Sequence, residues 1–175
     1  MNGAVYGRRL ASPVRLALAM ELGAPLDGGW WPHTASIARE LPELIAALSR
    51  RLGEIIAISI NWSSLEASPD LDALNCARTA NPDRIISRQR LMKVTGRWAS
   101  ANLLVVPCRT SSVLAIMVLR QAAALPIMPT ERNTQAFWTG DDIVRSARAE
   151  SFLCGQRSED AGPTAISTPD PAMTD

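Results

Sequence analysis

The sequence predicts an α+β fold, in which a mainly antiparallel sheet of about four to five strands packs against two helices. Several short stretches show the two-residue alternation or the β-branched composition of strands, whereas two longer stretches show helical spacing. The connections between most successive strand candidates are too short for a helical crossover, which favours antiparallel neighbours. The chain has 175 residues, which is long enough for one domain with its own core.

A single α+β domain is predicted over residues 13–125, after a flexible leader over residues 1–12. Within residues 14–22, large apolar side chains alternate with small or charged ones, which indicates a strand with one buried face. A turn is predicted over residues 24–33, because Gly28 and Gly29 tolerate backbone angles that other residues avoid.

The first predicted helix ends at Gly53, with Thr34 or Ser36 as its N-cap. Pro42 lies within this stretch and predicts either a kink or a main helix that starts there. The apolar residues that define its buried face recur at helical spacing, and they are Ile37, Leu41, Leu44, Ile45, Leu48 and Leu52.

The β-branched run in residues 54–62 is predicted to be a central strand, followed by a loop over residues 63–83. Residues 84–88 form a short strand candidate. The segments 91–95 and 102–107 are predicted to pair as a hairpin with a longer loop.

A second helix is predicted over residues 113–125, capped by Ser111 or Ser112 and ended by Pro126. Residues 126–154 are interpreted as a partly helical extension, in which residues 143–152 suit a third, short C-terminal helix. Residues 155–175 are rich in proline and poor in apolar residues, so a disordered tail is expected there.

Composition excludes several classes of protein. A net charge of +1 excludes a histone-like protein or an acidic tail at the level of the whole chain. The three cysteines are odd in number and widely spaced, which favours a reduced, cytoplasmic compartment over a disulfide scaffold. No apolar stretch reaches the length of a membrane span, and no signal peptide is visible, so no membrane association is expected.

Catalytic chemistry has few candidates in this sequence. His33 is the sole histidine, and Asp27 is the nearest acid that precedes it in the sequence. No nucleophile motif accompanies them, no set of ligands has metal-site spacing, and no glycine-rich phosphate loop is present, so neither a metal nor a cofactor is expected. We therefore predict no catalytic residue.

Two segments are candidate binding surfaces. The first is the turn with Asp27, Trp30, Trp31 and His33. The second is the basic segment Arg84–Arg97, which carries +5 within fourteen residues and contains no acid, so the rest of the chain carries −4. Its cations lie beside an aromatic residue, a combination that can hold phosphates or single strands. They are Arg84, Arg88, Arg90, Lys93 and Arg97, followed by Trp98. Solubility of an exposed sheet face explains the same charges, and nucleic-acid domains carry a stronger basic bias, which argues against a nucleic-acid partner.

Three motifs add a family resemblance. The chain contains an LDGxWWP turn at residues 26–32, an ELPxL helix at residues 40–44 and an LLVVP strand at residues 103–107. With these motifs it resembles a small actinobacterial, mycobacterial-type domain family of unknown function over residues 13–125. The resemblance implies the strand, turn and helix order given above, and it brings no activity, cofactor or site residue.

The leading functional hypothesis is a non-enzymatic binding or regulatory module whose partner is another protein or a second copy of the chain. One alternative is a small-molecule enzyme that uses Asp27 and His33 beside Trp30 and Trp31. The other alternative is weak nucleic-acid binding through the basic segment.

Overall fold

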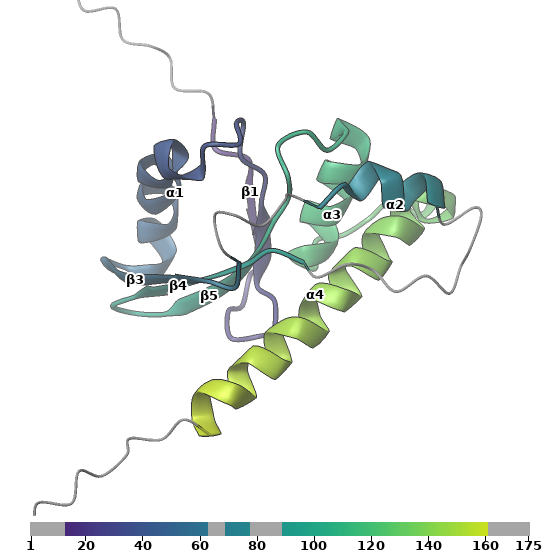
Figure 1. Ribbon diagram of the computed structural model, residues 1–175. Coiled ribbons are helices and arrows are strands. Elements are labelled where there is room, and N and C mark those ends of the chain that lie inside the picture. Colours follow the sequence, from purple (N-terminus) through teal and green to yellow (C-terminus); the bar gives the residue numbers. More distant parts are fainter. Residues whose placement is uncertain (1–12, 63–68, 78–88, 161–175) are drawn as a thin grey trace, which may run out of the picture.

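The protein is an α+β structure built on one mixed five-stranded sheet, as a computed structural model shows (Figure 1). The structure describes residues 13–62, 69–77 and 89–160. The strands are β1 (Leu16–Leu18), β2 (Gly28–Trp30), β3 (Ile55–Ile60), β4 (Leu91–Gly96) and β5 (Ser100–Val105). The helices are α1 (Ile37–Leu52), α2 (Leu71–Ala77), α3 (Ser112–Ala122) and α4 (Gln135–Asp160), with a short 3₁₀ helix, η1 (Pro129–Asn133).

The strand order is β1-β2-β5-β4-β3, and three of its four pairings are antiparallel. The exception is the β2–β5 pair, in which the strands run parallel with Trp30 opposite Val105. The predicted α+β class with a mainly antiparallel sheet is therefore confirmed. The parallel pair also brings the carboxyl ends of β2 and β5 to the same edge of the sheet.

Helices cover both faces of this sheet, since alternate side chains along each strand belong to two separate cores. On one face, Trp30, Leu103 and Val105 pack with Leu44 and Leu48 of α1. The other core contains Leu104 and Val106 together with buried residues of α2, α3 and α4, namely Leu71, Leu114, Ala115, Val118, Leu119, Ala122, Ile143, Val144 and Ala147.

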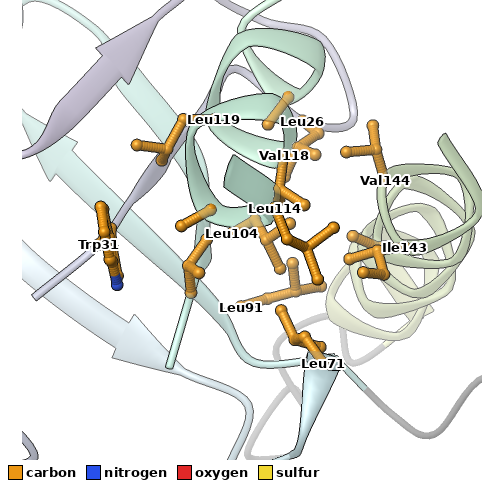
Figure 2. Close-up of a cluster of buried hydrophobic side chains, with 14 residues drawn as sticks. Leu26, Trp31, Leu71, Leu91, Leu104, Leu114, Val118, Leu119, Ile143 and Val144 are labelled. Carbon is orange, nitrogen blue, oxygen red and sulfur yellow. The ribbon is translucent and has the colours of Figure 1, made fainter. Parts of the chain in front are cut away.

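The second core extends beyond residue 125. Figure 2 shows Ile143 and Val144 of α4 facing Leu114 and Val118 of α3, and neither α4 side chain exceeds 2% exposure. Helix α4 spans 26 residues, so it is much longer than the short helix predicted over residues 143–152. It also continues to Asp160, past the predicted start of the tail, whereas residues 1–12 and 161–175 lie outside the described part.

The predicted turn contains a strand. Gly28 and Gly29 form most of β2, because the absence of a side chain lets neighbouring elements approach closely. A Cβ at Gly28 would lie 2.1 Å from the backbone oxygen of Ala17 on β1, and one at Gly29 would lie 2.8 Å from Leu119 of α3. The glycines therefore allow β2 to lie between β1 and α3.

Other predicted elements differ in extent or place. The strand expected over residues 14–22 is limited to β1, and part of the loop expected over residues 63–83 is helix α2. The run 54–62 is a strand as predicted, but β3 lies at the edge of the sheet and not at its centre. The short strand expected over residues 84–88 lies outside the described residues.

The predicted hairpin and both main helices are present, but the hairpin loop is short, because only residues 97–99 connect β4 with β5. Strands β4 and β5 pair antiparallel, with Thr95 opposite Ser100. Helix α1 begins at Ile37 and runs through Pro42, so the expectation of a main helix that starts at Pro42 is wrong. Its C-cap is Gly53, whose φ of 78° is readily adopted by glycine. Ser111 is the N-cap residue of α3.

Candidate functional site

A cleft of about 740 Å³ opens where the parallel strands β2 and β5 end. Its walls come from the segment after β2, the segment after β5, the start of α2 and Arg90 before β4. Ligand pockets commonly have volumes of about 300–1,000 Å³, and the carboxyl ends of parallel strands are a frequent location for them. The polar residues that line the cleft are Thr34, Asp70, Asp72, Arg90, Cys108, Arg109 and Thr110.

The two acids of the cleft are already bound by backbone groups near helix starts. Asp72 accepts hydrogen bonds from the backbone N–H of Ser111 (2.8 Å) and from its hydroxyl (2.6 Å). Because Ser111 is the N-cap residue of α3, this carboxylate lies near the positive end of the helix dipole. Asp70 accepts a hydrogen bond from the N–H of Ala73 in the first turn of α2 (3.0 Å). Both carboxylates therefore have hydrogen-bond partners within the protein.

The cations of the cleft are Arg90 and Arg109. The Arg90 guanidinium lies 5.4 Å from the centre of the Trp62 ring. The backbone oxygen of Arg90 accepts a hydrogen bond from the N–H of Val105. Arg109 is exposed, and the described residues offer it no ion-pair partner. Within the same part of the chain, the buried hydroxyl of Thr110 also has no hydrogen-bond partner.

An arginine fixes the two-tryptophan turn beside the cleft. The guanidinium carbon of Arg15 lies 3.6 Å from the centre of the Trp31 ring, and its side chain donates to the backbone oxygens of Trp31 and Pro32. Burial lowers the pKa of Arg15, while the nearby Glu40 and Cys108 act in the opposite direction. Both Trp30 and Trp31 are buried, so neither ring forms an exposed contact surface.

The sequence of the chain matches one known family. Residues 15–122 match a family of unknown function, DUF5994. The chain belongs to this family. The match begins just before β1 and ends with α3, so it includes both strands of the parallel pair and all the residues that line the cleft. No curated protein and no solved structure matches the chain.

In this DUF5994 chain, Glu40 closes the turn before α1. Its carboxylate accepts hydrogen bonds from the backbone N–H groups of His33 (2.7 Å) and Thr34 (2.6 Å) and from the Thr34 hydroxyl (2.8 Å). Partial burial raises the pKa of Glu40, but these hydrogen bonds outweigh that effect, so its pKa lies below the usual value. His33 itself is exposed, and its Nε2 atom lies 3.2 Å from the backbone oxygen of Pro13.

Asp27 lies at the opposite end of β2 from His33. It is 1% exposed, and its carboxylate accepts hydrogen bonds from the backbone N–H groups of Gly23, Ala24 and Asn102. These three bonds fix the entry of β2 beside β5. The structure therefore does not bring Asp27 and His33 together, as an acid and base pair would require.

The described cations of the basic segment are spread along β4. Arg90 lies at the cleft, Lys93 is exposed in mid-strand, and Arg97 lies in the hairpin turn, where it pairs with Glu54 at 3.3 Å. Trp98 is 74% exposed and rests on the backbone of Gly53. Because β4 separates Arg90 from Arg97, these cations do not form one compact patch. The predicted residues Arg84 and Arg88 lie outside the described part.

Sequence reasoning missed Arg109, Thr110 and Asp72 as parts of one site. A local signal existed, since Arg109 and Thr110 stand between a predicted strand and the cap of a predicted helix. The contribution of Asp72 depends on its contact with Ser111, which is 39 residues away in the sequence. Such a contact has no local signature.

Three further findings concern the described residues only. No helix among them is both long and apolar enough to cross a membrane. They contain no group of three or more His, Cys, Asp and Glu side chains that could hold a metal ion. The three cysteines form no disulfide.

Proposed function

We propose that this DUF5994 chain is a non-enzymatic binding module and that the cleft between the ends of β2 and β5 and the start of α2 is its ligand site. One observation carries the proposal. The acids of the cleft are bound by backbone groups at helix starts, whereas Arg109 has no ion-pair partner in the described part of the chain.

The electrostatics of the cleft favour a small ligand with an anionic group and an apolar body. Arg109 and Arg90 supply positive charge, and Val105, Val106 and Pro107 supply apolar lining. An arginine binds carboxylates and phosphates through paired, charge-assisted hydrogen bonds. The hydroxyl of Thr110 is a further group in this wall that can donate or accept a hydrogen bond.

Binding is favoured over catalysis because the candidate catalytic pair is divided. Asp27 uses its carboxylate to hold backbone groups at the start of β2, and His33 lies beyond the other end of that strand. No histidine lines the cleft among the described residues. The proposal includes a cytoplasmic location, which rests on the cysteine pattern of the sequence.

Thermal unfolding of the full chain with a panel of anions tests the proposal. The panel contains inorganic phosphate, a small dicarboxylate and an aromatic carboxylate, and a bound ligand raises the melting temperature. We expect Arg109→Gln to weaken the affinity of a binding anion about tenfold, because a charge-assisted contact is lost.

Arg132→Gln is the matched control. Arg132 is exposed on η1, and its replacement by Gln removes the same positive charge as Arg109→Gln. Helix η1 lies at the far end of α3 from the cleft. The 11 residues of α3 correspond to about 16 Å. If no anion binds, or if both variants bind equally well, the cleft is not an anion site.

A further inference from the structure

Strand β3 has the composition of a buried strand but lies at the edge of the sheet. In the described residues it hydrogen-bonds only to β4, so its outer row of backbone N–H and C=O groups has no strand beside it. The sequence of β3, IIAISI, contains neither a charged residue nor a proline. Natural edge strands usually carry such residues, because an open edge is a template for another strand.

The side chains of this edge are also exposed. Ile56 is 66% exposed and Ile60 is 48% exposed, although both are large β-branched residues. The one feature that interrupts the edge is a register shift between Ile55 and Ala57. A shift of this kind bends a strand locally, but it leaves the remaining backbone groups available.

We propose that β3 pairs antiparallel with β3 of a second copy of this chain, so that the two sheets join across a two-fold axis. With the axis beside Ile58, Ile56 of one copy lies opposite Ile60 of the other. The two-fold symmetry produces this Ile56–Ile60 pair twice, so the two most exposed apolar side chains of each strand are covered by the other copy. This contact between the two β3 strands, the seam, gives hydrogen-bond partners to the open backbone groups of both edges.

Charge favours a second copy as the occupant. In the same register, Glu54 of one copy lies beside Trp62 of the other, where the Arg90 guanidinium stands 5.4 Å from the ring centre. Glu54 and its partner Arg97 are both about 70% exposed, so Glu54 is accessible from the edge. Opposite charges therefore meet at both ends of the seam, and no charged residue lies between them.

A seam of one strand pair buries little surface, so the dimer is weak and depends on concentration. Sedimentation equilibrium of the full chain over a series of concentrations measures it. We expect the wild type to move from monomer to dimer as its concentration rises. We expect Ile60→Lys to remain monomeric, because a lysine opposite Ile56 places a charge in the seam.

The matched control is Ile116→Lys. Ile116 is 50% exposed on α3, which makes it nearly equal to Ile60 in exposure, but it lies away from the edge. Backbone amide exchange supplies the second measurement. We expect the amides of β3 to become more protected as the wild-type concentration rises, and those of Ile60→Lys to show no such change.

Three results overturn the proposal. One is a wild type that stays monomeric at every concentration. The edge of β3 would then be free to pair with an extended segment of a different protein instead. Another is an Ile60→Lys variant that dimerises as well as Ile116→Lys. The third is a dimer whose formation leaves the exchange of β3 amides unchanged, because association then occurs elsewhere on the chain.

Discussion

Replacing Ile143 tests whether α4 is an integral part of the fold. Ile143 is fully buried in the core that α4 shares with α3, although it lies outside the residues that match DUF5994. Ile143→Ala removes buried methyl and methylene groups and leaves a cavity facing Leu114 (Figure 2). Helix α4 cannot close this cavity freely, because Val144 and Ala147 are packed in the same core.

The expected cost is about 3 kcal/mol, since replacing a buried isoleucine by alanine destabilises proteins by about 2–5 kcal/mol. For a chain of this length, each kcal/mol lowers the melting temperature by about 2–4 °C. We therefore expect a decrease of about 6–12 °C. Urea unfolding followed by circular dichroism gives the free energy directly, and thermal unfolding gives the shift in temperature.

Phe152→Ala is the control on the same helix. Phe152 is 58% exposed, so its replacement is expected to change the stability by less than about 0.5 kcal/mol. A cost below about 1 kcal/mol for Ile143→Ala would contradict the packing of Ile143 in a shared core, because a cavity there is more costly than that. Equal costs for the two variants would show that α4 is not docked on α3 as described.

Two further predictions concern the turn before α1 and the start of β2. Because the pKa of Glu40 is lowered in the folded state, its contribution to stability is present above its unfolded pKa of about 4.3 and is lost as the pH falls through its folded pKa. Glu40→Gln is therefore expected to be less stable than the wild type by about 1 kcal/mol at pH 7, and this difference in stability is expected to shrink as the pH falls. Urea unfolding at several pH values measures the difference, and a difference that does not change with pH contradicts the prediction. Gly28→Ala is expected to destabilise the chain by about 3 kcal/mol in the same assay, because its Cβ would collide with the backbone oxygen of Ala17. Gly155→Ala, on the open surface of α4, is expected to be neutral or stabilising by up to about 1 kcal/mol, and a harmless Gly28→Ala would show that β1 and β2 are not in close contact.

The elements with strong local signals could be predicted from the sequence. The helical spacing from Ile37 to Leu52 and the glycine that follows predict α1 and its end. Two apolar runs predict the β4–β5 hairpin, although with a longer loop than the one that connects the two strands. Gly28 and Gly29 predict a turn when only the local sequence is considered, because glycine is common in turns and disfavoured inside strands. The two glycines allow close packing against β1 and α3, and these elements lie outside the segment that contains the glycines.

Position within the sheet could not be predicted either. The isoleucines of β3 indicate a strand, but residue type does not determine which neighbours a strand has. The cleft depends on the parallel pairing of β2 with β5, whose residues Trp30 and Val105 are 75 positions apart. Only that pairing brings Arg109 and Pro32 to one cleft, so a search for local motifs could not find the site.

A titration of the isotopically labelled full chain with inorganic phosphate and the two carboxylates, followed by NMR, tests the central claim that the cleft binds a small anion. We expect the amide signals that move most to belong to Arg109, Thr110 and Thr34, and we expect Arg109→Gln to abolish these shifts while Arg132→Gln preserves them. Signals that move mainly around Lys93 or on the exposed part of α4, or spectra that do not change with any of the anions, would contradict it.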